Sequence, residues 1–308
     1  MKAIELINIL RPMAEEGQID LRLDAPLSEY SSFRIGGPAD LVVHPKNRAA
    51  LLEIIRLFQN NECPFRVFGN ASNLLFSDEG YRGAVIFTTA MQDCSVEENR
   101  IISDAGVSFT ALAVKARNHA LSGLEFAYGI PGTVGGANYM NAGAYGGSVS
   151  DHLISSVCFD PKSGTVFEIE GNDAHAFAYR HSVYMENGCV ILGGTFSLEM
   201  GDMDAIGSKM KEHMDSRKTK QPLEFPSAGS VFKRPVGYFA GKLIEDAGLK
   251  GFFIGGAQVS EKHAGFIINR GGATASDVNR LIEHIQNEVL GRFGVKLETE
   301  IIRLGAED

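Results

Sequence analysis

The chain has 308 residues, of which 44% are hydrophobic and 22% are charged, the composition of an ordinary globular protein. Its formal net charge of -9 excludes a general binder of nucleic-acid backbones, and no segment reaches the roughly 20 apolar residues that span a membrane. A chain of this length can form two or three domains of roughly 100 to 150 residues each, so a sizeable core is expected.

The first part of the chain has the pattern of one compact α+β unit. Its start alternates apolar and acidic residues, which is not typical of a secretory signal, and we therefore interpret the protein as cytoplasmic. In chain order we expect a helix, a loop, a strand, an amphipathic helix, a strand, a polar loop and a strand, over residues 4–16, 25–40, 41–45, 47–61, 64–69, 70–80 and 83–89.

Two further units follow. The second opens with a strand over 99–106 and a helix over 109–121, passes through a glycine-rich tract, and ends in strands over 153–160, 165–171 and 189–200. Helices then alternate with strands over 204–222, 240–248, 252–260, 265–272, 275–293 and 295–305. We predict an α+β protein with three domains, at 1–92, 93–205 and 206–308.

Cysteines and histidines give no sign of a metal or redox centre. Cys63, Cys94, Cys158 and Cys189 lie too far apart for C-x-x-C spacing, which favours reduced and buried thiols. His175 and His181 have no acidic pair nearby that would complete a ligand set, so we predict no metal site.

The glycine-rich tract, residues 122–147, has eight glycines and only one charged residue, Glu125. Its segment "GIPGTVGG" has neither the G-x-G-x-x-G order of a Rossmann fold nor the order of a P-loop. Successive glycines can gather backbone N–H groups around an anion, but a crossover between packed elements explains the tract equally well.

A second small-residue loop, "GNASN" at 69–73, follows a predicted strand and has no basic residue nearby. Backbone and amide dipoles can neutralise a pyrophosphate where lysine is absent, although such a stretch on its own is more often a turn. Because two such loops occur on adjacent predicted units, they suggest one long dinucleotide between them.

Six segments, "SSFRIGGPAD", "FGNASNLLFSDEGYRG", the tract at 122–147, "YRHSVY", "SRKTKQPLEFPSAGSVFKRP" and "GVKLETEIIRLG", resemble the UDP-N-acetylenolpyruvoylglucosamine reductase family in sequence and order. The resemblance covers nearly the whole chain. It implies a two-part FAD-binding module of the PCMH or vanillyl-alcohol-oxidase type, which holds FAD non-covalently, and a C-terminal α+β domain that closes over a nucleotide-sugar substrate.

The activity implied by the resemblance belongs to peptidoglycan precursor synthesis. NADPH reduces the flavin, which then passes hydride to UDP-N-acetylglucosamine enolpyruvate and yields UDP-N-acetylmuramate. The residues that the resemblance assigns to FAD binding are Arg34, Gly69, Asn70, Ala71, Ser72, Asn73, Leu74, Gly129, Ile130, Pro131, Gly132, Gly135, Gly136, Asn141 and Gly143.

Three residues fall on the family's catalytic positions: Arg180, Ser230 and Glu300. Hydride addition to an unsaturated carboxylate pushes negative charge onto the carboxyl group, where a planar arginine donor is suited to receive it. Ser230 falls on the proton donor, in a glycine turn expected to lead into a strand, and Glu300 lies in the expected strand over 295–305. Without the resemblance, we would interpret Arg180 as an ion-pair residue, Ser230 as a turn residue and Glu300 as an outward-facing carboxylate on an edge strand.

Substrate contacts are expected from the basic segment that precedes Ser230. Lys220 matches the family's substrate lysine, and the residues we expect around the UDP-sugar are Tyr179, Arg217, Lys220 and Lys233. The alternative to a substrate contact is that Arg217 is a solvated charged residue at the end of a helix. Ala71 and Arg234 depart from the family pattern, and "YRHSVYMENGCVIL" resembles the shorter class that lacks a tyrosine-bearing loop over the substrate.

Three other functions remain open from the sequence. One is a flavin oxidase of the same broad fold, although loop 69–73 has no histidine for covalent FAD attachment. Another is a nucleotide-sugar binding module without redox activity. A Rossmann-type nicotinamide enzyme is disfavoured by the missing glycine fingerprint. No obligate protein partner is evident.

Overall fold

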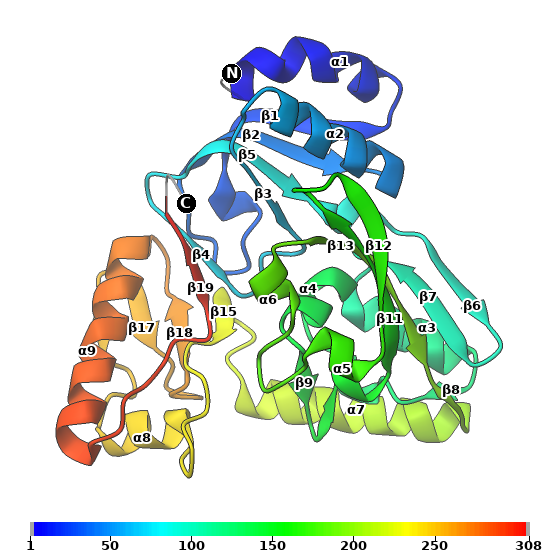
Figure 1. Cartoon of the computed structure of the whole chain (residues 1–308). Coiled ribbons are helices and arrows are strands. Elements are labelled where there is room, and N and C mark those ends of the chain that lie inside the picture. The colour runs from blue at the N-terminus through cyan, green and yellow to red at the C-terminus, as the bar shows by residue number, and fades with distance from the viewer. Residues whose placement is uncertain (1–2, 306–308) are drawn as a thin grey trace. The chain divides into compact units, whose positions relative to one another are not determined.

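A computed structural model describes residues 3–305, and its helices and strands form two compact units (Figure 1). The first unit takes in the described part of Met1–Leu23, Asp40–Asn70 and Gly83–Asp215, and the second takes in Asp24–Ala39, Ala71–Arg82 and the described part of Ser216–Asp308. Both units mix helices with largely antiparallel strands, so the predicted α+β class is confirmed. The expected three-domain boundaries stay a prediction.

A four-stranded sheet and two helices form the first layer of the first unit. The strands are β1 (Ile19–Pro26), β2 (Pro38–Pro45), β3 (Phe65–Phe68) and β5 (Tyr81–Phe87), in the order β1-β2-β5-β3. Helices α1 (Ile7–Glu15) and α2 (Arg48–Asn60) join them in one hydrophobic cluster. α2 begins where Asn47 Oδ1 accepts a hydrogen bond from Ala50 N at 2.9 Å, which satisfies an orphan donor of the first turn.

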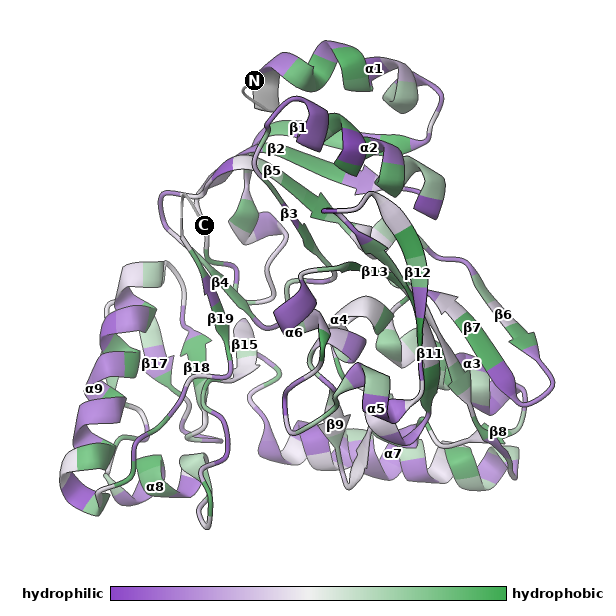
Figure 2. Cartoon of the chain, in the orientation of Figure 1, coloured by the Kyte–Doolittle hydropathy of each residue, from purple (hydrophilic) through white to green (hydrophobic). Residues whose placement is uncertain are grey.

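A five-stranded antiparallel sheet forms the rest of the first unit. Its strands are β6 (Cys94–Glu97), β7 (Arg100–Asp104), β11 (Leu153–Asp160), β12 (Thr165–Glu170) and β13 (Val190–Ser197), in the order β12-β11-β13-β7-β6. Helices α3 (Phe109–Asn118) and α4 (Val134–Tyr139) pack against it. Strands β2, β5 and β13 are largely green in Figure 2, as expected of strands buried on both faces.

Short elements connect these strands. They are α5 (Asn172–His175), α6 (Tyr184–Asn187), and the strand pairs β8 (Leu121–Ser122) with β14 (Glu199–Met200) and β9 (Gly143–Ala144) with β10 (Gly147–Ser148). The long helix α7 (Met203–Lys220) then leads from the first unit into the second.

The second unit has an antiparallel sheet covered by two helices. The strands are β15 (Ser227–Ser230), β16 (Phe253–Ile254), β17 (Ala257–Val259) and β18 (Phe266–Asn269), in the order β15-β18-β17-β16, and the helices are α8 (Ala240–Asp246) and α9 (Ala275–Phe293). A separate parallel pair joins β4 (Leu74–Phe76) to β19 (Ile302–Leu304). Asp78 binds the start of α9, because its carboxylate accepts from Ala275 N at 2.7 Å and Ser276 N at 3.0 Å.

Three expected elements differ from the structure. The expected polar loop over 70–80 contains β4, whose residue Leu75 is buried in the core of the second unit. The expected strand over 295–305 forms a ladder only at β19, and the expected loop over 25–40 contains the end of β1 and the start of β2. In each case pairing with a distant segment decided the structure, and local sequence carries no signal for such pairing.

Candidate active site

Arg180 lies at the tip of a tight turn in the first unit. Ala178 and His181 exchange two backbone hydrogen bonds of 3.2 Å, which leaves Tyr179 and Arg180 as the two central residues of the turn. Arg180 has a φ of +54°, a conformation that costs a residue other than glycine on the order of 1 kcal/mol or more. Surrounding contacts must therefore hold the turn in place.

The glycine-rich tract provides several of these contacts. Asn141 Nδ2 donates to Ala178 O at 3.0 Å, and an Arg180 guanidinium nitrogen donates to Gly143 O at 3.3 Å. The same guanidinium lies 5.1 Å from the centroid of the Tyr179 ring. The structure thus brings together the expected catalytic Arg180, the expected substrate residue Tyr179 and two expected cofactor residues.

The segments that carry Ser230 and Glu300 lie side by side in the second unit. Glu300 N donates to Val231 O at 2.7 Å, and Lys233 N donates to Glu298 O at 2.9 Å, so the two segments run antiparallel beside each other. Ser230 and Glu300 are both half-buried, whereas Glu298 is exposed. Both residues are therefore partly shielded from solvent on neighbouring segments of backbone.

The turn at Ser230 differs from the expectation. Ser230 is the last residue of β15 and does not precede a strand. Ser227 pairs with Ile268 and Ser230 with Phe266, so β15 carries one extra residue and bulges at Gly229, where φ is +76°. Such bulges re-aim a neighbouring side chain, and glycine adopts this backbone conformation without steric cost.

Asn73 links the expected flavin loop to Glu300. Its side-chain Nδ2 donates to Glu300 O at 3.1 Å, and its carbonyl accepts from Ile302 N at 3.0 Å. The pairing of Ile302 with Leu74 continues this contact into the β4 and β19 strands. Asn73 and Glu300 are far apart in sequence and are held side by side by the backbone pairing of their segments. The sequence pattern does not reveal this pairing.

Gly69 and Asn70 are fastened to the glycine-rich tract. A Cβ atom at Gly69 would overlap Thr133 Oγ1, and Asn70 Nδ2 donates to Pro131 O at 2.6 Å. Ala71, which follows, has a φ of +45°. Within residues 3–305, the N–H groups of Asn70, Ala71 and Ser72 donate to no backbone carbonyl. Consecutive N–H groups around a left-handed residue form a concave anion site, so this loop fits a pyrophosphate.

Other expected cofactor residues use their N–H groups inside the protein. Gly129 N donates to Thr110 Oγ1 at 3.0 Å, Gly135 N to Ala105 O at 2.8 Å and Gly136 N to Thr133 Oγ1 at 3.3 Å. A Cβ at Gly135 would lie 2.9 Å from Ala105 Cβ, which explains that glycine by packing. The flavin contacts of Ile130, Gly132, Leu74 and the exposed Arg34 stay predictions.

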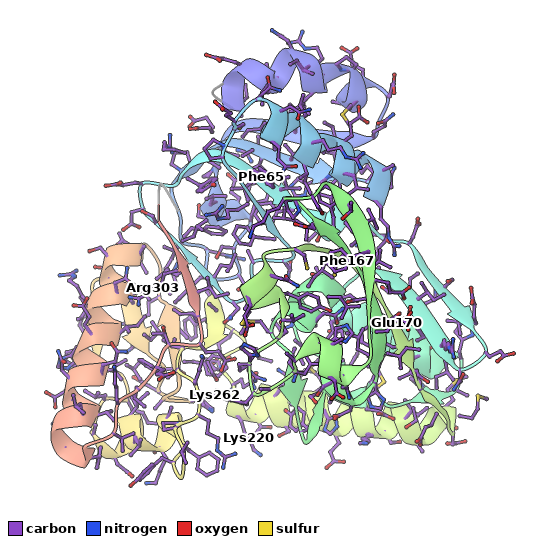
Figure 3. All side chains as sticks on the ribbon, viewed as in Figure 1. Phe65, Phe167, Glu170, Lys220, Lys262 and Arg303 are labelled. Atoms are coloured by element: carbon purple, nitrogen blue, oxygen red, sulfur yellow. The ribbon has the colours of Figure 1, made fainter. Side chains whose placement is uncertain are left out.

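The basic segment lies at the end of α7. Arg217 is only 8% exposed, so it is not the solvated helix end considered above, while Lys220 is exposed. Lys262, which the sequence pattern did not single out, is labelled with Lys220 in Figure 3. Its Nζ donates to Lys218 O at 2.7 Å and lies 3.5 Å from a carboxylate oxygen of Glu224. Lys233, which was expected to touch substrate, is half-buried.

The described residues contain neither a metal-binding cluster nor a helix able to cross a membrane. Among residues 3–305, no three His, Cys, Asp or Glu side chains gather as they would around a metal ion. Likewise, no helix in the described part of the chain is long and apolar enough to cross a membrane.

Two family models match the chain. An FAD binding domain matches residues 39–170, and the C-terminal domain of UDP-N-acetylenolpyruvoylglucosamine reductase matches residues 221–304. The first match supports the expected FAD-binding module, and the second covers Ser230 and Glu300.

Whole-chain relatives agree with these matches. A UDP-N-acetylenolpyruvoylglucosamine reductase of Caldanaerobacter subterraneus is 47% identical over 97% of this chain and 98% of its own length. The enzyme of Latilactobacillus sakei is 47% identical over 93% of this chain and 94% of its own length. The crystal structure of the reductase from Thermus caldophilus superimposes with a TM-score of 0.78 at 33% identity, covering 92% of this chain and 98% of that one. The chain therefore belongs to the UDP-N-acetylenolpyruvoylglucosamine reductase family.

Proposed function

We propose that this chain reduces UDP-N-acetylglucosamine enolpyruvate to UDP-N-acetylmuramate, with FAD as its redox cofactor and NADPH as the reductant. Similarity to reductases along almost the whole chain supports the activity and disfavours an oxidase of the same broad fold. The structural observation that carries the proposal is the antiparallel pairing of residues 231–233 with 298–300, because it joins the segment that follows Ser230 to the segment that carries Glu300. A cytoplasmic location is part of the proposal, because nucleotide sugars are made there.

FAD, when bound, supplies the hydride that adds to the terminal carbon of the enolpyruvyl group. The N–H groups of Asn70, Ala71 and Ser72, which donate to no backbone carbonyl within residues 3–305, are suited to hold its pyrophosphate. Contacts inside the protein fix the start of this loop, because Gly69 packs closely against Thr133 and Asn70 donates to Pro131 O. Preorganisation of this kind lowers the entropic cost of binding.

Arg180 would bind the substrate carboxylate, on which negative charge accumulates as hydride adds to the neighbouring carbon–carbon double bond. Its guanidinium presents paired N–H donors in a planar fork, and its backbone is fixed by the turn at Ala178 and His181. A group held in place before the reaction stabilises developing charge without reorganising. Arg180 belongs to the first unit.

Ser230 would then donate its Oγ proton to the carbon next to the carboxylate and complete the saturated lactyl group. A serine hydroxyl is a weak acid, but the carbon that receives the proton is far more basic than an ordinary base. Glu300, which is half-buried, would help to orient the substrate. The UDP diphosphate would be held by basic side chains, of which we propose Lys220, Lys233 and Arg217, with Tyr179 at the sugar.

The proposal is tested by following flavin absorbance anaerobically. NADPH should bleach the flavin bands, and UDP-N-acetylglucosamine enolpyruvate should restore them with formation of UDP-N-acetylmuramate. UDP-N-acetylglucosamine without the enolpyruvyl group serves as control and should leave the bands bleached. Recovery of absorbance only on admission of oxygen would instead indicate an oxidase.

A further inference from the structure

A buried polar cluster in the first unit has no part in the proposed chemistry. Ser156 of β11, His175 at the end of α5 and Tyr184 at the start of α6 are 0%, 0% and 1% exposed. Tyr184 Oη lies 2.7 Å from Ser156 Oγ, and Ser156 Oγ lies 3.0 Å from His175 Nε2. His175 Nδ1 lies 2.6 Å from Gly171 O. The three side chains thus form one continuous line of hydrogen bonds.

The direction of every hydrogen bond in this line follows from its last member. Gly171 O can only accept, so His175 Nδ1 carries the proton. Burial lowers the pKa of His175, which keeps the ring neutral and leaves Nε2 as an acceptor. Ser156 must therefore donate to Nε2, and Tyr184 must donate to Ser156. Each buried polar group is satisfied in one arrangement only, which gives the cluster a single geometry.

The cluster borders the segment that carries Arg180. The His175 ring stacks on Phe177 with centroids 5.0 Å apart and an interplanar angle of 0°, and Phe177 immediately precedes the turn. Val183 N donates to His175 O at 2.8 Å, which closes the segment between His175 and Val183 into a loop. Movement of His175 would therefore be transmitted to both ends of the turn.

The other attachment of this loop is to the glycine-rich tract. Ser182 Oγ donates to Tyr139 O at 2.5 Å, and Asn141 Nδ2 donates to Ala178 O. These bonds hold the loop from one side, while the cluster of Ser156, His175 and Tyr184 holds it from the sheet. A left-handed arginine backbone persists only where its surroundings constrain it from more than one direction.

We infer that His175 is a positioning residue, which holds the Arg180 turn against β11 through Ser156 and Tyr184. The inference rests on the proposed role of Arg180 and adds to it three buried residues that never touch substrate. Loss of the cluster should leave FAD binding and flavin reduction by NADPH in place, because neither step needs the carboxylate clamp. Flavin reoxidation by substrate should slow instead.

The test compares His175→Phe, Ser156→Ala and Tyr184→Phe with wild type as FAD-loaded full-length protein. Each half-reaction is followed by stopped-flow absorbance, and the thermal midpoint is recorded for each variant. We expect reoxidation by substrate to slow by roughly tenfold to 10²-fold in His175→Phe and Ser156→Ala, the size of effect that a displacement of about 1 Å produces. His119→Phe makes the same chemical change at an exposed position and should leave both rates unchanged.

A second measurement separates this inference from the proposed function. If His175 acts through Arg180, then His175→Phe should add little to the slowing already caused by Arg180→Lys. Independent, multiplying effects of the two changes would overturn the inference, and so would full reoxidation rates in a folded His175→Phe or Ser156→Ala. Arg180→Lys with wild-type kinetics would instead refute the proposed role of Arg180. If His175→Phe fails to fold, the same comparison with Ser156→Ala decides.

Discussion

Substitution of Gly69 by alanine tests the joint packing of the two expected flavin loops. The added Cβ would overlap Thr133 Oγ1 and come within 3.2 Å of both Thr133 Cβ and Cγ2. Thr133 cannot yield easily, because its Oγ1 caps α4 by accepting from Gly136 N at 3.3 Å. Overpacking of this kind costs about 1 to 3 kcal/mol, and we expect the free energy of unfolding of Gly69→Ala to fall by that amount.

Thr133→Ala provides the matching arm of a double-mutant cycle. Alone, it removes the cap of α4 and should cost about 0.5 to 2 kcal/mol. In the double variant the clash with Oγ1 and Cγ2 is gone, so the combined loss should be smaller than the sum of the single losses by at least about 0.5 kcal/mol. Urea unfolding followed by circular dichroism measures all four proteins. Additive losses, or an unaltered midpoint for Gly69→Ala, would refute the close packing of these loops.

Three further predictions concern single side chains. Asn138→Leu should raise the free energy of unfolding, measured by urea denaturation, by about 1 to 3 kcal/mol. Asn138 is fully buried, and neither its side-chain oxygen nor its side-chain nitrogen has a protein partner within residues 3–305. A loss of stability would contradict this prediction. Burial lowers the pKa of His263 in the folded protein, where its Nδ1 accepts a hydrogen bond from Gly265 N at 3.1 Å. The stability that His263 contributes is therefore complete above its unfolded pKa of about 6.5. It is lost as the pH falls through that value toward the lowered pKa of the folded state. His263→Asn should therefore lose less stability than wild type between about pH 7 and pH 5 in thermal melts. Ser230→Ala should leave flavin reduction by NADPH unchanged and slow reoxidation by substrate by about 10²-fold to 10⁴-fold in stopped flow, whereas equal slowing of both steps would exclude Ser230 as the acid.

Elements with strong local signals could be predicted from sequence. Helix α9 spans the residues that its apolar period indicated, because Thr274 and Asp277 form a capping box at its start and Gly294, with a φ of +68°, ends it. Figure 2 shows purple and green alternating along α9, the pattern that made the helix recognisable. Here local propensity and tertiary burial agree.

Elements that depend on distant pairing could not be predicted. Residues 74–76 lie within a segment of small and polar residues, and only pairing with Ile302–Leu304 makes them a strand. Helix α4 lies inside a tract rich in glycine, which disfavours helices, and is held there because Val134 N and Gly135 N donate to Val107 O and Ala105 O. No local pattern carries information on either partner.

The candidate site was found through its motifs, but its geometry comes from backbone contacts. Arg180 is fixed by the Ala178 and His181 hydrogen bonds, and Glu300 by the bond from its N to Val231 O. Ser230 is fixed by strand pairing with Phe266. At Ser230 and Glu300 these contacts do not use the reactive part of the side chain, so substitution there should remove chemistry without moving the backbone.

Where the backbone stays in place, a change in rate after substitution can be attributed to the chemical group that was removed. Surface or half-exposed substitutions away from caps and cores usually change stability by less than about 0.5 kcal/mol, so Ser230→Ala and Arg180→Lys should keep wild-type thermal midpoints. Gly69→Ala should show the opposite pattern, with lost stability and no specific block in either half-reaction. If Ser230→Ala lowered the thermal midpoint as much as Gly69→Ala, its slow reoxidation would reflect a disturbed β15, and the assignment of Ser230 as proton donor would lose its support.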